Sequence, residues 1–142
     1  RYTLSDCWGY CGDANLTGAW LEEADLTDAV LSFVDLTDAV LRWADLTNAN
    51  FFYANLTDAN LRNADLTDAF LRWADLTDAE FWDADLTNAD FYSANLTGAF
   101  FFNADLTDAN LGGATVTNAT FLNCTWSNTT WTDHVTYNSN PT

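Results

Sequence analysis

Acidic side chains are the most regular chemical feature of the sequence, because aspartate recurs every twenty residues through its centre. The series is Asp25, Asp45, Asp65, Asp85 and Asp105, with Asp28, Asp68 and Asp108 close by in the chain. If the fold stacks the series at a strand spacing of about 4.8 Å, neighbouring carboxylates repel by roughly 1 kcal/mol in water. Either their pKa values are raised or cations lie between them. Calcium is the ion we expect if one binds; otherwise we expect no cofactor and a hydrated acidic surface, because no loop with a defined ligand set is visible.

Asparagine supplies a second kind of chemistry, the N-glycosylation sequon Asn-x-Ser/Thr. The six matches begin at Asn15, Asn55, Asn95, Asn118, Asn123 and Asn128. The first three lie in Asn-Leu-Thr, which any change of Asp to Asn in the common Asp-Leu-Thr creates. The last three are five residues apart near one end, and such a cluster predicts N-glycosylation of a secreted, extracellular protein. The alternative is a chain that is simply rich in Asn and Thr.

The cysteines are Cys7, Cys11 and Cys124. Cys7 and Cys11 can close a small N-terminal cap. Cys124 lies about 25 Å away along a rod built at strand spacing, whereas a disulfide joins Cα atoms within about 7 Å. One cysteine is therefore unpaired, which in a secreted protein predicts an intermolecular disulfide. A buried free thiol at Cys124 is the alternative.

The remaining composition argues against catalysis and against direct binding of nucleic acid. The chain has one His, no Lys, no Gly-rich phosphate loop and no nucleophile–base pair at a recognisable spacing. With four Lys+Arg against 21 Asp+Glu, its formal net charge of −17 opposes contact with phosphates. No apolar run is long enough to span a membrane. The sequence starts at Arg1 without an initiator Met or a signal peptide, so we expect a processed or truncated form.

These residues are positioned by a five-residue repeat, Ala-(Asp/Asn)-Leu-x-x. In the unit Ala44-Asp45-Leu46-Thr47-Asn48, an extended backbone points Ala44 and Leu46 inward and Asp45 outward, and the last two residues turn a corner. An α-helix does not fit, because positions five apart drift around its surface. A flat sheet does not fit either, because an odd period sends successive Leu residues to opposite faces.

The repeat holds its frame over residues 14–133 and is similar to the pentapeptide-repeat family. The resemblance implies an all-β fold, a right-handed quadrilateral β-helix of about six coils with four pentapeptides each. We expect an N-terminal cap over residues 1–13, the β-helix over 14–133 and a C-terminal tail over 134–142. Each coil contacts only its neighbours, so both ends need a cap.

Alternate pentapeptides differ, so four-sided coils place like units on opposite sides. Two sides are rich in Asp and Thr, and the other two expose aromatic residues together with Arg42, Arg62 and Arg72. The aromatic contact residues that we expect are Trp20, Trp43, Trp82, Phe52, Tyr53, Trp73 and Tyr92. Such patches mark contact surfaces, able to stack on sugars, pack side to side, or form cation–π pairs with arginine. The alternative is scattered surface aromatics that pack on one another.

The ends suggest assembly. Trp126 and Trp131 are too bulky for the inward column and can plug the C-terminal end. The tail over 134–138 alternates like a strand that either folds over its own end or pairs with another subunit. An uncapped end would allow head-to-tail stacking into a filament.

Three functions are consistent with these features. The first is an extracellular structural protein that is N-glycosylated and stacks head to tail with itself into a fibre or surface array. The second follows from the family resemblance, because some pentapeptide-repeat proteins are acidic rods that mimic DNA and bind type II topoisomerases. The third is binding of glycans by the aromatic sides.

Overall fold

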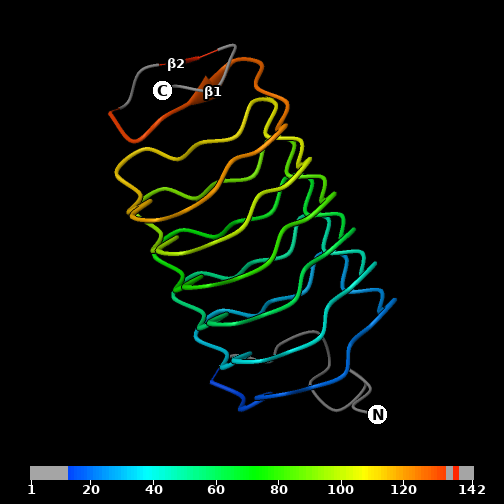
Figure 1. Cartoon of the computed structure of the whole chain (residues 1–142). Coiled ribbons are helices and arrows are strands. Elements are labelled where there is room, and N and C mark those ends of the chain that lie inside the picture. The colour runs from blue at the N-terminus through cyan, green and yellow to red at the C-terminus, as the bar shows by residue number, and fades with distance from the viewer. Residues whose placement is uncertain (1–12, 134–135, 138–142) are drawn as a thin grey trace.

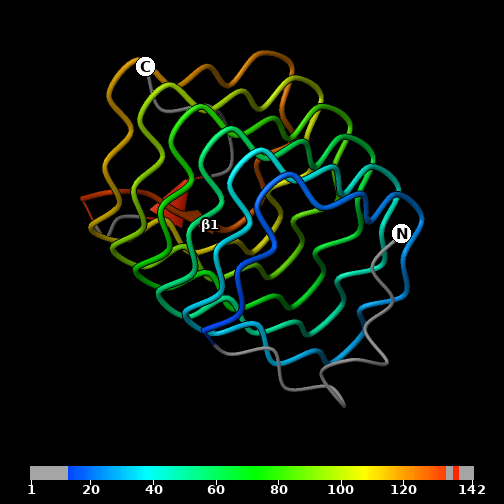
Figure 2. The ribbon, with the colours of Figure 1, turned by 90° about the horizontal axis from the view of Figure 1, so that it is seen from below.

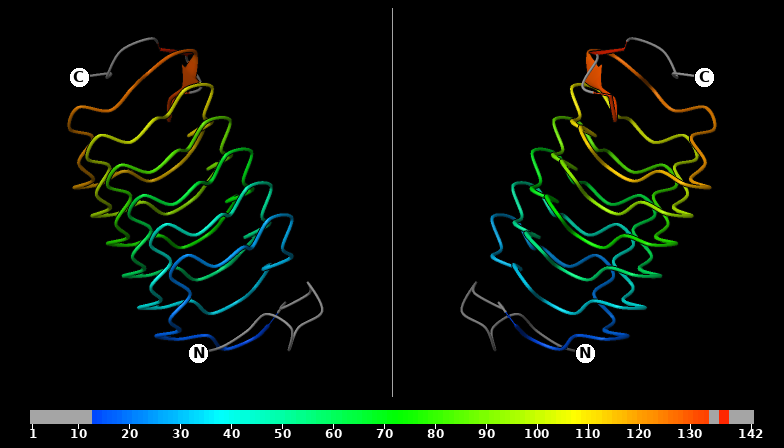
Figure 3. Two further views of the ribbon diagram at one scale, coloured as in Figure 1. Left: turned by 90° about the vertical axis from the view of Figure 1, so that its right-hand side faces the viewer. Right: turned by 90° about the vertical axis from the view of Figure 1, so that its left-hand side faces the viewer.

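The computed structural model describes residues 13–133 and 136–137, whose backbone winds into a stack of four-sided coils (Figure 1). Parallel bridges join successive coils with a constant step of twenty residues, from Asn15↔Asp35 to Asn110↔Thr130. Seen along the stack, successive coils follow the same four-cornered path (Figure 2). The two side views show the same regular rise from coil to coil (Figure 3). The predicted register of four pentapeptides per coil is therefore confirmed.

One pentapeptide shows why the chain folds this way. The amide of Leu46 donates to the Asp65 carbonyl of the next coil at 2.7 Å, and the Asn48 amide donates to Thr67 at 3.0 Å. Within the corner, the Ala49 amide donates to the Leu46 carbonyl at 2.9 Å. Each side contributes a single bridging residue instead of a longer strand, because two of every five residues turn the corner.

The corners use the left-handed backbone region. The fifth residue of each pentapeptide has a positive φ from Asp13 to Asn128, with values between 54° and 70°. Asp, Asn and Gly hold most of these positions, because short polar side chains and glycine adopt this conformation most readily. The expected division into straight sides and corners is therefore correct.

The core consists of two inward columns, as predicted. Ala19–Ala114 supply the small column, with Val34 in place of one Ala, and all of these side chains are at most 9% exposed except Ala24, which is partly buried. The large column of Leu and Phe includes Phe81, Phe91 and Phe101, which are fully buried. Because the apolar residues repeat with the coil, every coil buries a layer that contacts the layers above and below.

The C-terminal end is covered by aromatic residues and by a short strand pair. Phe121, Trp126 and Trp131 form a cluster with ring centroids 5.2–5.4 Å apart, so the predicted plug is present. The strand β1 (Thr129–Thr130) pairs antiparallel with β2 (Thr136–Tyr137), with Thr129 opposite Tyr137. This part of the predicted tail strand therefore folds back on its own end. The expected cap at residues 1–12 lies outside the described residues, as do residues 134–135 and 138–142.

Candidate functional site

The outward residues define four sides, which we name by their content. The aspartate side carries Asp25, Asp45, Asp65, Asp85 and Asp105, and the mixed side opposite carries Asn15, Asp35, Asn55, Asp75 and Asn95. The arginine side is defined by residues 19–23, 39–43, 59–63, 79–83, 99–103 and 119–123. The ladder side is defined by residues 29–33, 49–53, 69–73, 89–93, 109–113 and 129–133. The predicted alternation of acidic and aromatic sides is confirmed.

On the aspartate side each carboxylate is fixed by its own pentapeptide. The amide two residues later, from Thr27 to Thr107, donates to the carboxylate Oδ1 at 2.9–3.1 Å. Hydrogen bonds from the hydroxyl and the amide of Thr47 lower the pKa of Asp45 below its ordinary value of 3.8. The expectation of raised pKa values is therefore wrong for Asp45, because donors to the ionised form outweigh its desolvation. The side presents a row of carboxylates in fixed positions.

The candidate calcium ligands do not form a cage. No group of three or more His, Cys, Asp or Glu side chains positioned to hold a metal ion occurs among residues 13–133. The carboxylates lie in a line, one per coil, and each already accepts a backbone hydrogen bond. A calcium site needs six to eight oxygen ligands around one point, which this linear arrangement does not supply.

The mixed side dilutes its charge with asparagine. Asn95 Nδ2 donates to Asp75 Oδ1 at 3.2 Å and to Thr77 Oγ1 at 2.9 Å. Hydrogen bonds from Thr37 lower the pKa of Asp35. Asparagine also makes the same local contact as aspartate, because Asn15 Oδ1 accepts the Thr17 amide at 3.0 Å. Asn and Asp are therefore interchangeable at this position of the backbone.

The ladder side carries three outward rings stacked along the rod. Phe33, Tyr53 and Trp73 lie on successive coils with centroids 5.6 and 5.7 Å apart and interplanar angles of 7° and 9°. Phe52 meets all three rings edge to face at 4.7–6.0 Å. The stacked rings are 53%, 50% and 39% exposed in that order. Because each ring covers the face of its neighbour, the ladder presents mostly ring edges to solvent.

The stacked rings occupy strained backbone positions. Phe33, Tyr53 and Trp73 sit at corners with φ of 61°, 55° and 55°. A residue with a Cβ pays roughly 1–2 kcal/mol in this region, and bulky residues are rare there. Stacking contacts of about 0.5–1.5 kcal/mol per aromatic pair offset that cost. Strained residues are concentrated at functional sites, so the ladder is a candidate contact surface.

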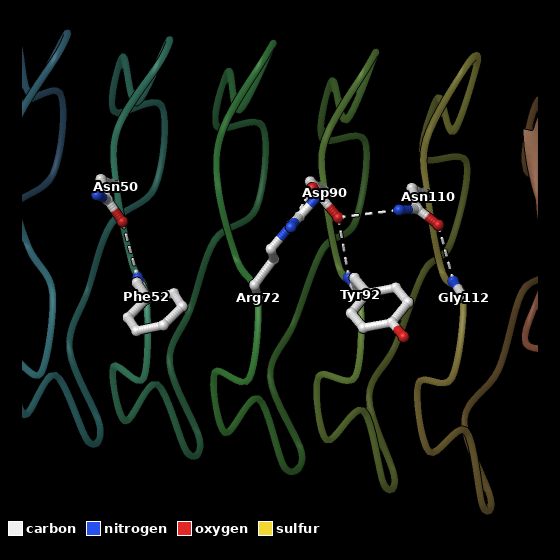
Figure 4. Close-up of polar contacts among 7 residues, drawn as sticks. All are labelled: Asn50, Phe52, Arg72, Asp90, Tyr92, Asn110 and Gly112. Atoms are coloured by element: carbon white, nitrogen blue, oxygen red, sulfur yellow. Dashed lines mark hydrogen bonds and ion pairs between the residues drawn. The ribbon is translucent and has the colours of Figure 1, made fainter.

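Arginine side chains link adjacent coils on both aromatic sides. Arg72 Nε donates to Asp90 Oδ2 at 2.5 Å, while Asn110 Nδ2 reaches Asp90 Oδ1 from the other direction at 3.1 Å (Figure 4). Arg62 Nε lies 2.8 Å from Glu80 Oε2 without pointing its N–H at it. These partly solvent-exposed pairs contribute little to stability, but they orient the guanidinium groups.

The predicted cation–π pairs are present. The guanidinium carbon of Arg42 lies 4.2 Å from the Trp43 ring centroid, and that of Arg62 lies 3.9 Å from Trp82. Arg72 lies farther from Tyr92, at 5.7 Å. The exposed rings of Trp43 and Trp82 are thus already in contact with cations of the same chain.

An apolar hollow of about 540 Å³ opens on the arginine side near the C-terminal end. It is lined by Trp82, Phe100, Phe102, Thr120, Phe121 and Leu122. Sequence reasoning placed Trp82 of this hollow among the outward contact residues but did not foresee Leu122, which is 59% exposed. The remaining expected contact residue, Trp20, is 57% exposed at the other end of the same side.

The sequons differ in accessibility. Asn118, Asn123 and Asn128 lie at exposed corners on three successive sides of the last coil. Asn55 and Asn95 are half-buried, and the Nδ2 of Asn95 is engaged in hydrogen bonds. Asn15 is exposed. Accessibility therefore favours the C-terminal cluster, and glycosylation itself stays a prediction.

Cys124 is a free, half-buried thiol, and its side chain hydrogen-bonds to the Phe101 carbonyl. Burial raises the pKa of the Cys124 thiol to about 11, which suppresses the thiolate needed for disulfide exchange. Cys7 and Cys11 lie outside the described residues. The intermolecular disulfide therefore loses physical support at Cys124.

Sequence reasoning missed two features of the sides. It did not foresee the ion pairs Arg62–Glu80 and Arg72–Asp90, although both join residues eighteen apart on adjacent coils. It also did not identify the cost of aromatic residues at corners, which was visible as Phe33, Tyr53 and Trp73 in the place that Asp, Asn or Gly usually takes. No helix long and apolar enough to cross a membrane occurs in the part of the chain that the structure describes.

The family model for pentapeptide repeats matches the chain in eight copies, at residues 10–48, 54–91 and 84–123. No protein with a curated description matches. Full-length QnrB1, a plasmid-mediated fluoroquinolone resistance protein, is similar in structure with a TM-score of 0.59 and 17% identity, over 83% of this chain and 63% of QnrB1. Its trypsin-treated form gives 0.52 and 21%, over 80% of this chain and 61% of QnrB1. The chain thus spans about three fifths of the length of QnrB1.

A third similar structure is HetL, a pentapeptide repeat protein involved in heterocyst differentiation regulation from the cyanobacterium Nostoc sp. strain PCC 7120. It is 26% identical over 89% of this chain and 80% of HetL, with a TM-score of 0.35. The family match and the QnrB1 structures confirm the predicted fold, a right-handed quadrilateral β-helix. At these identities the structural similarity shows the fold of the chain and does not identify a binding partner for it.

Proposed function

Because the chain belongs to the pentapeptide-repeat family, whose members are generally non-enzymatic binding or structural proteins, we propose that it is an acidic rod that mimics DNA. In this proposal it occupies the DNA-binding surface of a type II topoisomerase. The proposal rests on the amount of charge that the rod carries per unit length and on the regular placement of that charge.

The charge density of the rod is the observation that carries the proposal. Residues 14–133 hold 19 of the 21 Asp+Glu and three of the four Arg, a formal net charge of −16, and their six coils rise over roughly 29 Å at strand spacing. This gives about one negative charge per 1.8 Å, close to the spacing of about 1.7 Å along duplex DNA. A basic channel that binds duplex DNA therefore meets a similar linear charge on this protein.

Fixed geometry adds to the charge. Asp25, Asp45, Asp65 and Asp85 are exposed, and each has one carboxylate oxygen held by a backbone amide. Ordered charges lose little conformational freedom on binding, so more of the electrostatic attraction appears as affinity. The aspartate side is the side that we expect to contact the enzyme, because aspartate there is unbroken over five coils.

The test is a supercoiling assay with bacterial DNA gyrase, combined with direct binding to the enzyme in the absence of DNA. We expect the protein to bind the enzyme, to inhibit supercoiling and to be displaced by excess linear duplex. Affinity should fall steeply with salt, since both partners release or exchange counterions. Absence of binding at low salt would reject the proposal.

A secreted, glycosylated assembly protein is the second candidate, favoured by the exposed sequons at Asn118, Asn123 and Asn128. Head-to-tail stacking has less support than glycosylation. Leu21 and Leu31 of the first described coil are at most 4% exposed, so they offer little apolar surface to a second copy. At the other end, β2 already pairs with β1 of the same chain. Intact mass of the native protein under reducing and non-reducing conditions separates this candidate from the DNA-mimicking rod. The secreted assembly protein predicts added hexose and a disulfide-linked species.

Glycan binding on the ladder side has the weakest geometric support of the three. Sugars stack on exposed ring faces, whereas Tyr53 is sandwiched between Phe33 and Trp73. A glycan-array experiment tests this candidate, and strong binding that Trp73→Ala abolishes would favour it over the acidic rod.

A further inference from the structure

Trp20 and the apolar hollow lie at opposite ends of the arginine side. Trp20 belongs to the first described coil, is 57% exposed, and stacks on no ring or guanidinium group among residues 13–133. The hollow of about 540 Å³ lies on the last three coils, where Phe100 and Leu122 line it with exposed apolar surface. One end of the side thus carries a protruding indole, and the other end carries an apolar hollow.

The charge of the rod is distributed unevenly over its four sides. The aspartate side carries eight acids and no arginine, and the mixed side carries five acids and no arginine. The arginine side carries four acids and two arginines, a net charge of −2, and the ladder side carries two acids and one arginine, a net charge of −1. Two copies of this acidic rod therefore repel each other least when they meet through an aromatic side.

Of the two aromatic sides, the arginine side has the better surface for a second copy. The outward rings of the ladder side stack on one another, whereas the arginine side holds a hollow with apolar walls. An apolar side chain that enters such a hollow removes apolar area of both partners from water. One side makes up about a quarter of the accessible surface of 6738 Å², and a standard interface takes about 800 Å² from each partner. Contact over about half of the arginine side is therefore sufficient.

Two-fold symmetry with antiparallel rods brings the indole of one copy to the hollow of the other. Each coil then faces the coil that is equally far from the other end of the stack, and each column of outward residues faces the same column of the second copy. Because the column from Trp20 to Thr120 advances by twenty residues per coil, Trp20 faces Thr120 in the wall of the hollow. In the next pair of coils Val40 faces Phe100. A parallel pair would instead place the two hollows against each other.

We propose that two copies of the chain associate through the arginine side as an antiparallel two-fold dimer, in which the Trp20 indole of each copy enters the apolar hollow of the other. Both copies use the same surface, so the contact closes at two copies and does not grow into a filament. The inference goes beyond the proposed function, because the dimer leaves the aspartate side exposed. The same two-fold axis places the aspartate sides of both copies on one flank, which widens the acidic surface.

The test is sedimentation velocity over a range of protein concentrations, in reducing buffer to exclude disulfide-linked dimers. Trp20→Asn removes the indole, and Phe100→Asn removes a wall of the hollow. Asparagine already occupies this position of the pentapeptide at Asn60 and Asn110, so both variants suit the fold. Each variant should weaken the dimer about 25-fold, because two symmetric contacts are lost and each contributes about fivefold. Phe70→Asn is the matched control, since Phe70 is an exposed ring at the same position on the ladder side, and it should leave the dimer unchanged.

Mixing the two variants tests the antiparallel geometry itself. In a mixed dimer, the intact indole of the Phe100→Asn copy meets the intact hollow of the Trp20→Asn copy. One of the two contacts is thereby restored, so the mixed dimer should form about fivefold more tightly than the dimer of either variant alone. Sedimentation of one fluorescently labelled variant in an excess of the other measures this gain. The absence of any gain on mixing would overturn the proposed arrangement.

Salt separates the dimer contact from the gyrase contact. The dimer should tighten as salt rises, because screening reduces the repulsion between two acidic rods, whereas gyrase binding should weaken. Species larger than two copies, or a chain that stays monomeric at about 1 mM, would overturn the proposal. Binding of the neutral dye Nile red to such a monomer, lost in Phe100→Asn, would assign the hollow to a small apolar ligand instead. A dimer that does not bind gyrase would reject the proposed function and leave the dimer contact intact.

Discussion

On the aspartate side each outward carboxylate is held by its own pentapeptide, whereas on the ladder side each stacked ring is held by a ring of an adjacent coil. Asp65 accepts the amide of Thr67 at 2.9 Å, two residues along the chain. Tyr53 stacks on Phe33 and Trp73, twenty residues before and after it. The backbone bonds between coils are the same on both sides.

The difference concerns how interactions propagate. Neighbouring carboxylates repel one another, so the aspartate side is stabilised locally and strained along the rod. Neighbouring rings attract one another, so the ladder side is strained locally at its corners and stabilised along the rod. One solenoid scaffold thus supports a charged surface and an aromatic surface with opposite signs of coupling between coils.

The largest expected effect is the loss of unfolding free energy on truncating a core leucine, and it should be equal beneath the two sides. Leu66, beneath the aspartate side, and Leu71, beneath the ladder side, are both fully buried. Leu66→Ala and Leu71→Ala should each lower the free energy of unfolding by about 2–5 kcal/mol, because each leaves a cavity in the same column. Urea denaturation measures both, and a loss confined to one side would show that the core is not shared equally.

Coupling between coils should have opposite signs on the two sides. A double-mutant cycle on Tyr53 and Trp73, each changed to Ala, should give a favourable coupling of about 0.5–1.5 kcal/mol. A cycle on Asp45 and Asp65, each changed to Asn, should give an unfavourable coupling of up to about 1 kcal/mol that vanishes in high salt. Unfolding of the four variants in low and high salt checks both signs. Favourable coupling between the aspartates would contradict the comparison.

The local hydrogen bond of the aspartate side can be separated from its charge. Asp65→Ala removes the acceptor for the Thr67 amide and should destabilise the fold by about 0.5–1.5 kcal/mol. Asp65→Asn keeps that acceptor, as Asn15 and Asn55 do on the mixed side, and should be neutral or slightly stabilising. Chemical denaturation of the two variants in parallel separates the contribution of the hydrogen bond from that of the charge. Equal destabilisation by both variants would mean that the charge of Asp65, and not its hydrogen bond, stabilises the fold.

The smallest expected effect is on the pH dependence of stability. The pKa of Asp45 is lowered from 3.8 by Thr47, so its contribution to stability is present above pH 3.8 and is lost as the pH falls through the lower pKa of the folded state. Thr47→Val removes the hydroxyl donor and should raise the pKa of Asp45 towards 3.8. A carboxyl-carbon NMR titration between pH 2 and 6 measures the change, with Asp35 as an internal control that should not move.

The sequence predicts the architecture of this protein closely because the repeat leaves few choices. A period of five with Ala and Leu two apart defines which side chains point inward, and twenty residues per coil place Asp25 above or below Asp45. The aromatic plug at Trp126 was also predictable, since a large residue replaced a small or medium one in the inward column.

Contacts that depend on rotamers were not predictable. Nothing in the spacing says that Arg62 approaches the Trp82 ring to 3.9 Å while Arg72 stays 5.7 Å from the Tyr92 ring, because both arginines occupy the same position of the pentapeptide and both pair with an acid eighteen residues later. The direction of the Asp45 pKa shift was mispredicted for a similar reason. The repulsion between stacked aspartates follows from their spacing in the sequence. The hydrogen bonds that the amide and hydroxyl of Thr47 donate to Asp45 depend on the geometry of the turn.

The most direct test of the account is the affinity of two charge-matched variants for gyrase. One changes the five aspartates of the aspartate side, Asp25, Asp45, Asp65, Asp85 and Asp105, to Asn; the other changes Asp35, Asp38, Asp58, Asp75 and Asp78, on the mixed side and its corners, to Asn. Both remove five charges and keep residues that suit their backbone positions. The account predicts a loss on the order of tenfold or more for the first variant and a much smaller loss for the second. Equal losses, or a larger loss for the second, would contradict the claim that the aspartate side is the DNA-like contact surface.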